Sequence, residues 1–270
     1  MIRALSLPTV VILATVTVLA AQTRSRSFGL PDDQWCRQDR QANFCEVRQD
    51  TLLGLSSIDV DAAPNGGIAV RGWDRGDVQV RTKISVFADR DADARDVAAG
   101  VTVQTGGGAI HAEGPARRDN TYWNASFELY VPRTSSLTLK ARNGGITIGE
   151  FAGAARFASI NGGVALTGVD GDVRGETVNG GITIELAGPR WTGAGLDVET
   201  RNGGITMAIP RNYSAQLEVG TTNGGFAIDF PINVQGNLTR FDRHIVTTLG
   251  AGGPRVRAMT TNGGVAIRAR

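Results

Sequence analysis

The chain has 270 residues, of which 41% are hydrophobic, so it is long enough to bury the core of one large domain or two ordinary ones. Its formal net charge of only +2 argues against a dedicated nucleic-acid binder, which needs a strongly basic surface. Glycine is abundant at 36 residues, but it has no three-residue period, and this excludes a collagen-like chain.

Residues 1–21 have the pattern of a secretory signal peptide. Arg3 supplies a positive charge, the apolar stretch VVILATVTVLAA follows, and small residues place the cleavage site near Ala20 or Ala21. The alternative is a retained membrane anchor, but a spanning helix needs about 20 apolar residues, and Pro8 and the polar QTRSRS leave this stretch short. We therefore expect an exported protein, either periplasmic or extracellular at the cell surface, with no stable membrane insertion after cleavage.

Residues 22–50 are predicted to form a polar N-terminal segment and cap that contains both cysteines. Cys36 and Cys45 are an isolated pair, and in an oxidising compartment such a pair favours a disulfide. Two free thiols are the alternative. The histidines are His111 and His244, and neither is near the cysteines in sequence, so no metal site is expected there.

Residues 51–135 contain alternating segments, SSIDVDA, GDVQVRTKISVFA, GVTVQT and SFELYVP, which predict strands. We interpret them as irregular, wider first coils of the repetitive fold that follows. One short helix is expected, from Asp89 to about Gly100, because acidic residues occupy its first turns and a glycine closes it.

The dominant motif is Asn-Gly-Gly (NGG), followed by an apolar, a small and an apolar residue. It occurs seven times, beginning at Asn65, Asn143, Asn161, Asn179, Asn202, Asn223 and Asn262. From Asn143 the steps are 18, 18, 23, 21 and 39 residues. Each repeat predicts a strand, a bend at NGG and a second strand, which indicates coils that stack in parallel. The predicted fold is an all-β, single-stranded β-solenoid (β-helix) over residues 51–270, with a right-handed winding favoured and regular coils at 136–230.

The alternation also predicts which side chains point into the solenoid. Those on either side of the small residue would be buried: Ile146 and Ile148, Val164 and Leu166, Ile182 and Ile184, Ile205 and Met207, and Phe226 and Ile228. The small residues between them would point outward: Thr147, Ala165, Thr183, Thr206 and Ala227.

The NGG motif is interpreted as a structural corner and not as a ligand site. Gly-Gly permits the positive φ angles of a sharp turn, and Asn tolerates the left-handed region as well. Alternatively, the Asn amides point inward and stack from coil to coil as a hydrogen-bonded ladder, which explains why Asp does not replace Asn. A calcium-binding repeat would need an Asp soon after its glycines, and a phosphate loop would need a following helix; neither pattern follows an NGG here.

The end of the chain departs from the regular step. Residues 231–253 are an insertion that contains His244, and we expect it to be a binding surface because insertions in repeat proteins often map to one face. Residues 254–270 form the last coil. We expect this coil to be an open edge of the stack, guarded by Arg268 and Arg270.

These residues resemble the bacterial DUF4097 proteins, which are often labelled adhesins. The likeness rests on LYVPRTSSLTLKARNGGITI, on the NGG repeats, on the ending TLGAGGPRVRAMTTNGGVAIR, and on FCEVRQDTL ahead of the first strand. It covers about residues 45–270. The resemblance implies an exported, repetitive all-β protein without established catalysis.

We expect a non-enzymatic, adhesin-like binding or scaffold protein of the bacterial cell envelope, because repeat solenoids present extended surfaces. Its candidate partners are a carbohydrate or another protein of the envelope. No catalytic, cofactor-binding or metal-binding residue is assigned, and no cofactor is expected.

An enzyme that acts on polysaccharides, a lyase or a hydrolase, is the alternative function. Such an enzyme needs two converging carboxylates, or carboxylates together with a metal and a basic residue. The candidates are Asp170 and Asp172, and in the insertion Asp242, Arg243 and His244. Asp170 and Asp172 lie in GVDGDV, a sequence that is also typical of a turn. An ice-binding solenoid would need a regular threonine column, whereas the outward column mixes Thr and Ala irregularly.

Overall fold

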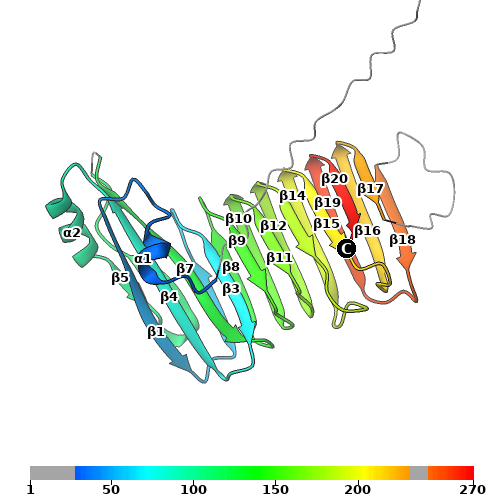
Figure 1. The fold of residues 1–270 in the computed structure, drawn as a ribbon, viewed down its shortest axis with the longest axis horizontal. Coiled ribbons are helices and arrows are strands. Elements are labelled where there is room, and N and C mark those ends of the chain that lie inside the picture. The colour runs from blue at the N-terminus through cyan, green and yellow to red at the C-terminus, as the bar shows by residue number, and fades with distance from the viewer. Residues whose placement is uncertain (1–27, 119, 231–242) are drawn as a thin grey trace, which may run out of the picture.

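The computed structural model describes residues 28–118, 120–230 and 243–270, which form an elongated all-β protein (Figure 1). Two ten-stranded sheets pack against each other, and two short α-helices, α1 (Asp32–Cys36) and α2 (Asp91–Ala99), lie at the N-terminal end. Neither helix has the length and hydropathy of a membrane span. The predicted signal peptide at 1–21 and residues 231–242 of the predicted insertion lie outside the described residues.

The two sheets are called sheet A and sheet B, and their strands are given in spatial order. Sheet A contains β1 (Phe44–Leu53), β4 (Asp77–Phe87), β7 (Tyr122–Pro132), β3 (Ile68–Trp73), β9 (Ile146–Gly149), β11 (Val164–Thr167), β13 (Ile182–Glu185), β15 (Ile205–Ile209), β20 (Val265–Ala269) and β17 (Phe226–Asp229). Sheet B contains β18 (His244–Leu249), β16 (Ala215–Asn223), β19 (Arg255–Asn262), β14 (Gly195–Asn202), β12 (Asp172–Asn179), β10 (Ala154–Asn161), β8 (Ser136–Ala141), β2 (Ser57–Asp61), β6 (Ala109–Glu113) and β5 (Thr102–Gln104).

Each NGG motif joins a strand of sheet B to a strand of sheet A, and we call such a pair of strands a coil. The coils are β2/β3, β8/β9, β10/β11, β12/β13, β14/β15, β16/β17 and β19/β20. Neighbouring coils pair in parallel, and the register sets Asn161 opposite Asn179 and Asn179 opposite Asn202. The repeat in the sequence is therefore a repeat in space, in a solenoid-like stack of two-stranded coils.

The coils do not stack in the order of the sequence. The last coil, β19/β20, lies between β14/β15 and β16/β17, so the expectation that it forms an open edge is wrong. The reason is that β18 pairs antiparallel with one side of β16 and leaves the other side of β16 to β19. At this end of the stack, the outermost strands are β17 and β18, and Arg268 pairs in register between Ala208 and Asp229.

The N-terminal part combines one regular coil with an antiparallel extension. β2/β3 is a coil of the ordinary kind, with its NGG at Asn65, so the wider coils predicted for 51–135 are not present as such. Instead, β7 pairs parallel with β3 and is followed in sheet A by β4 and β1, each antiparallel to its neighbour. In sheet B, β6 pairs parallel with β2, and β5 pairs antiparallel with β6. The predicted helix is present as α2, which buries Ala94 and Ala98 against Ile84 and Val86. The five-residue helix α1 was not predicted.

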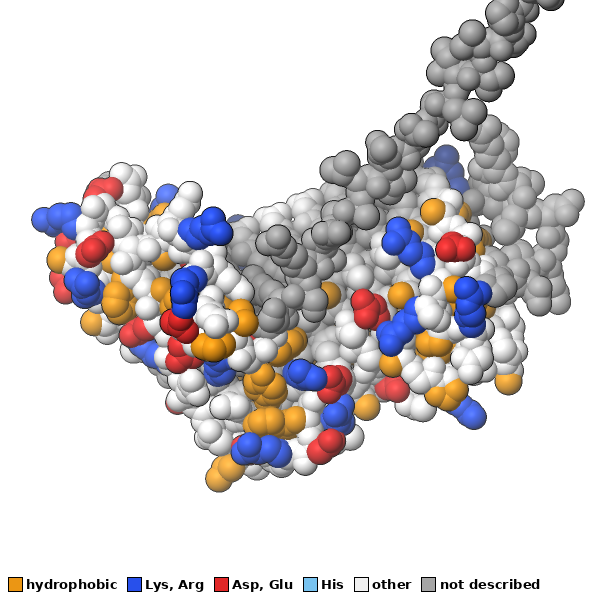
Figure 2. Space-filling model, viewed as in Figure 1, with side chains coloured by type: hydrophobic (Ala, Val, Ile, Leu, Met, Phe, Trp, Pro, Cys, Tyr) orange, Lys and Arg blue, Asp and Glu red, His pale blue; other side chains and the backbone are white. Residues whose placement is uncertain are grey.

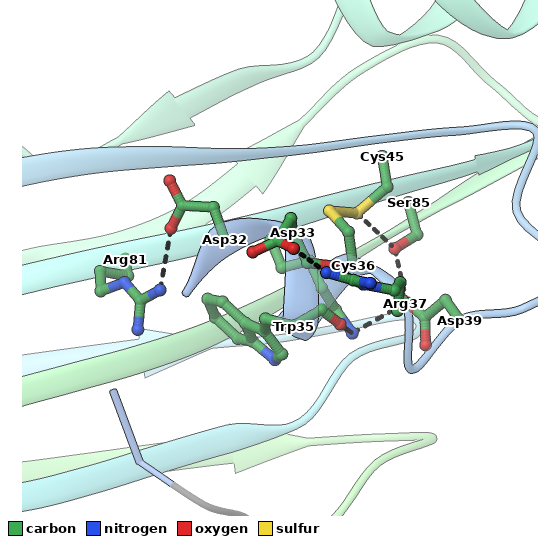
Figure 3. Close-up of a disulfide and its surroundings, with 10 residues drawn as sticks. Asp32, Asp33, Trp35, Cys36, Arg37, Asp39, Cys45, Arg81 and Ser85 are labelled. Atoms are coloured by element: carbon green, nitrogen blue, oxygen red, sulfur yellow. Dashed lines mark hydrogen bonds and ion pairs between the residues drawn. A yellow bond between two sulfur atoms is a disulfide. The ribbon is translucent and has the colours of Figure 1, made fainter. Parts of the chain in front are cut away.

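Helix α1 covers charged side chains that point out of sheet A (Figure 3). Arg81 pairs with Glu128 and with Asp32, and Lys83 Nζ lies 2.9 Å from Asp39 Oδ2. Trp35 lies over both cations, with its ring centroid 5.0 Å from the Arg81 guanidinium carbon and 5.5 Å from Lys83 Nζ. Because the buried charges are paired, the N-terminal segment lies on the sheet without an isolated buried ion.

The two cysteines are bonded in the structure, and this crosslink attaches α1 to β1. The Cα atoms of Cys36 and Cys45 are 5.7 Å apart. We expect the variant Cys36→Ser with Cys45→Ser to lose about 2–3 kcal/mol of unfolding free energy, since the crosslink closes only a short loop. Chemical denaturation of oxidised wild type against the double variant measures the loss. An unchanged midpoint would contradict a stabilising role for the disulfide.

The core lies between the two sheets and follows the alternation of the sequence. The inward pairs predicted for β9, β11, β13 and β15 are all buried, at 1% exposure or less. Phe226 and Ile228 are half-buried because β17 is an edge strand. The outward residues Thr147, Ala165 and Thr206 are half-buried, and Ala227 is exposed, as the register predicts.

Candidate functional site

The asparagines of the seven NGG motifs form one continuous row of hydrogen-bonded amides. In spatial order the row is Asn65, Asn143, Asn161, Asn179, Asn202, Asn262 and Asn223. Each asparagine after Asn65 donates from Nδ2 to Oδ1 of the asparagine before it in this order, over 2.8–2.9 Å. We call this feature the amide row. Except for the half-buried Asn65, its residues are exposed, so the amides stack as one interpretation predicted but do not point inward.

The corner does not use the left-handed backbone that the sequence led us to expect. None of the NGG residues has a positive φ, so the expectation of a left-handed turn at Asn or Gly is wrong. The first glycine is needed for close approach instead. A Cβ on Gly180 would lie 2.2 Å from the carbonyl oxygen of Gly162, and a Cβ on Gly162 would lie 2.1 Å from that of Gly144. Backbone stacks on backbone here, and this leaves no room for a side chain.

A hydroxyl two residues before the Asn completes the corner. Thr177 Oγ1 donates to the carbonyl oxygen of Gly162 over 2.8 Å, and Thr200 donates to that of Gly180 over 2.7 Å. Equivalent bonds join Ser159 to Gly144, Thr260 to Gly203, and Thr221 to Gly263. These five residues are 2–4% exposed, so the bonds give partners to hydroxyls on buried side chains.

We expect Asn179→Asp to destabilise the protein at neutral pH by about 1–2 kcal/mol, because a carboxylate cannot donate to Asn161 and faces its Oδ1 at hydrogen-bond distance. This repulsion raises the pKa of the introduced carboxyl above its unfolded value of about 3.9. The variant should therefore recover stability as the pH falls through that raised pKa, since the protonated acid can donate.

Asn65→Asp is the matched control for this variant. In the amide row, Asn65 accepts a hydrogen bond from Asn143 and donates none, so a carboxylate preserves its contact. Urea denaturation of both variants at pH 7 and at pH 4 separates them. If both variants lost the same stability at pH 7, the direction of hydrogen-bond donation assigned to the row would be wrong.

A groove of about 570 Å³ opens at the end of the amide row that begins with Asn65. Its floor includes the first three amides of the row, Asn65, Asn143 and Asn161. The remaining lining residues come from the loop before Asn65, the segment 115–117, the start of β7 and the end of β8: Pro64, Pro115, Ala116, Arg117, Tyr122, Trp123 and Arg142. Four segments distant in sequence therefore meet in one groove.

Aromatic contacts hold the wall of the groove in place. Tyr122 stacks on Phe87 with ring centroids 4.7 Å apart, and the Arg117 guanidinium lies over Tyr122, 5.0 Å from the ring centroid. Trp123 Nε1 donates to the carbonyl oxygen of Pro115 over 2.9 Å. The indole thereby ties the 115–117 segment, which contains Arg117, to the start of β7 at the groove.

The groove has polar groups that the fold leaves available. Asn161 uses one N–H and one acceptor lone pair within the row and keeps a second of each. Asn143 uses both of its N–H groups, one to Asn65 Oδ1 and one to the carbonyl oxygen of Pro64 over 3.0 Å, and keeps a second acceptor lone pair. Neither Arg117 nor Arg142 forms an ion pair in the part of the chain that the structure describes. The arrangement therefore offers amide donors, amide acceptors and two cations to a ligand, next to apolar walls.

The family comparison agrees with this architecture. The family model described as Toastrack DUF4097 matches residues 58–268, which is most of the chain and contains all seven NGG motifs. The chain belongs to the DUF4097 family. No curated protein matches the sequence.

Three solved structures resemble the DUF4097 chain distantly. A "putative cell adhesion protein" from Clostridium sporogenes has a TM-score of 0.41 and 8% identity, and the match covers 83% of this chain and 100% of that one. A "putative adhesin" from Bacteroides fragilis has a TM-score of 0.36 and 10% identity, over 85% and 99% of the chains. A "putative lipid binding protein" from Parabacteroides distasonis has a TM-score of 0.26 and 8% identity, over 83% and 96%. Likenesses at this level support no argument about function.

The acidic candidates for catalysis are dispersed in the DUF4097 fold. Asp170 accepts a hydrogen bond from the backbone N–H of Thr192 over 3.0 Å, which is a turn contact. Asp172 pairs with Arg174 and Arg156 on the outer face of sheet B. His244, on β18, lies four strand steps from β12, or about 19 Å at the usual strand spacing, and pairs with Glu218.

The predicted insertion is only partly within the described residues. Asp242 lies outside them, and Arg243 donates to the carbonyl oxygen of Thr222. Residues 244–249 form β18, an added strand of sheet B, so this half of the insertion extends the stack. Figure 2 shows basic and acidic side chains interspersed on the visible face, without a large region of one sign.

Sequence reasoning missed the groove residues Arg117, Tyr122, Trp123 and Arg142. Arg142 directly precedes an NGG asparagine, so its place beside the row could have been inferred. The other three lie in the segment RRDNTYW, which has no repeat signal. Their meeting with the amide row depends on β7 pairing with β3, a contact between strands that are far apart in the chain.

Proposed function

We propose that this chain is an exported, non-enzymatic, adhesin-like binding protein of the bacterial cell envelope, built on a right-handed solenoid. The observation that carries the proposal is the groove at the Asn65 end of the amide row. There, Arg117 and Arg142, which form no ion pair with a described residue, line one open space together with the amides of Asn65, Asn143 and Asn161, and aromatic packing holds its wall. Concave sites with a few convergent polar groups are the usual places of ligand binding.

Two further features support binding without catalysis. Within the described part of the chain, the residues that line the groove include no carboxylate and no histidine, the groups that most often perform acid–base chemistry. Among the described residues, no group of three or more His, Cys, Asp and Glu side chains is placed to hold a metal ion. The disulfide supports export, because such bonds persist in oxidising compartments.

The test is binding of the mature chain to an array of glycans and isolated envelope polymers, with size analysis of every bound polymer. The blocking variant is Ala116→Trp, which fills the groove from an exposed position and leaves the asparagines of the amide row unsubstituted. The matched control is Ala158→Trp, in a hollow of about 400 Å³ on the outer face of sheet B. We expect a polymer to be bound intact, with a loss of affinity of about tenfold or more for Ala116→Trp and little change for the control.

A shortened polymer would overturn the non-enzymatic proposal and favour the enzyme. Binding that Ala158→Trp abolishes and Ala116→Trp leaves unchanged would move the site to sheet B. The absence of any ligand across the array would contradict a role in polymer binding.

A further inference from the structure

The charge of the groove is one-sided, in contrast to the other arginine-rich surface of the molecule. On the outer face of sheet B, Arg156 and Arg174 share Asp172, at 3.6 and 2.9 Å. In the groove, Arg117 and Arg142 have no carboxylate partner among the described residues, and none of the described residues that line the space is a carboxylate. A ligand with negative charge would therefore meet cations that no protein group already neutralises.

The amides of the groove suit hydroxyl groups. A hydroxyl both donates and accepts. Asn161 keeps one N–H and one lone pair outside the row's own bonds, whereas Asn143 keeps only a lone pair, because its second N–H donates to the carbonyl oxygen of Pro64. The walls formed by Pro64, Pro115 and Ala116 are apolar and lie beside these amides. A sugar ring combines hydroxyl edges with apolar C–H faces, so it matches this alternation of polar floor and apolar wall.

The amide row continues beyond the groove. From Asn161 it passes through Asn179 to Asn202, one strand step at a time, and these positions are exposed. The step between parallel strands is about 4.8 Å. A polymer seated in the groove therefore finds a regular track of identical amides in one direction, which a single small molecule would not use.

Building on the binding function proposed above, we propose that the groove binds an acidic polysaccharide. Its carboxylates pair with Arg117 and Arg142, its hydroxyls bond to the amides of Asn65, Asn143 and Asn161, and its chain continues along the amide row.

The test uses two forms of one polymer, polygalacturonate and its fully methyl-esterified form, which keeps the sugar chain and removes the negative charge. We expect the full-length mature protein to bind polygalacturonate at least about tenfold more tightly, with an affinity that falls as salt is raised. Polyglutamate is the third probe, since it carries carboxylates without hydroxyls, and we expect it to bind weakly. Titration calorimetry measures all three.

Paired variants assign the effect to the groove. Arg117→Gln with Arg142→Gln should weaken binding of polygalacturonate by about tenfold or more. The matched control, Arg156→Gln with Arg174→Gln, removes the same charge from sheet B and should leave the affinity within about twofold. If both double variants lost affinity equally, the effect would come from net charge alone, and the assignment of the site to the groove would be wrong.

The outcomes separate this proposal from the one on which it rests. If the esterified polymer or polyglutamate binds as tightly as polygalacturonate, or if none of the three binds, the acidic-polysaccharide class is wrong. The binding function itself would still stand if another polymer of the array were displaced by Ala116→Trp. If nothing in the array were displaced by that variant, the groove would lose its function as well.

Discussion

Replacing Gly180 by Ala should cost at least about 3 kcal/mol of unfolding free energy, the upper end of what overpacking costs. The new Cβ would lie 2.2 Å from the carbonyl oxygen of Gly162 and 2.5 Å from its carbonyl carbon, and these atoms belong to the backbone of the next coil. A flexible side chain could move away, but here the two coils must separate. The separation would also stretch the bond from Asn179 to Asn161 and the bond from Thr177 to Gly162.

Gly225→Ala is the control for this substitution. Gly225 is the second glycine of an NGG motif, has no positive φ, and has no atom within 4 Å of the position that a Cβ would take. Its replacement should be neutral or slightly stabilising, because alanine restricts the unfolded chain. Thermal and urea denaturation of both variants decide the matter. Similar stability of the two would show that the coils do not stack backbone on backbone.

Replacing Ile182 by Asp should lower the unfolding free energy by about 4 kcal/mol or more, a larger loss than that expected for Gly180→Ala. We expect the variant to show no cooperative unfolding transition when it is heated through moderate temperatures. Ile182 is 1% exposed and lies in register between Val164 and Ile205, so the new carboxyl would be surrounded by apolar side chains. A carboxyl in such a place loses its hydration and gains no partner. Circular dichroism during heating measures the loss.

Ala165→Asp provides the matched comparison on the opposite face of the neighbouring strand. Ala165 is half-buried and points outward between Thr147 and Thr183, where water reaches the new carboxyl. Its melting temperature should change by only a few degrees, about what 1 kcal/mol produces. The reverse ranking of the two variants would mean that the register is shifted by one residue, since such a shift exchanges the two faces.

The regular part of the fold could be predicted from the sequence because its signal is local and repeated. Alternation identified the buried faces of β9, β11, β13 and β15, and the NGG spacing identified the coils. The order of the last two coils could not be predicted. Every coil carries the same motif, so either β16 or β19 could pair with β14. Which of the two strands does so depends on β18, which occupies one side of β16.

The site was less accessible to prediction than the fold. The amide row followed from identical asparagines at a regular step, but its exposure did not, because an NGG corner can place its amide on either side. The groove depends on the N-terminal extension of the stack, where Tyr122 and Trp123 begin β7 and the 115–117 segment lines the same space as the amide row. Those contacts join residues about 20–60 positions apart without any repeating pattern to reveal them.

The most direct test of the account is a nuclear magnetic resonance titration of the ¹⁵N-labelled mature protein with oligogalacturonate, read at the side-chain amides. The account predicts that the signals of Asn65, Asn143 and Asn161 and the indole signal of Trp123 shift together, in proportion to occupancy. Shifts confined to the outer face of sheet B around Arg156 and Arg174, with those asparagines unmoved, would contradict it.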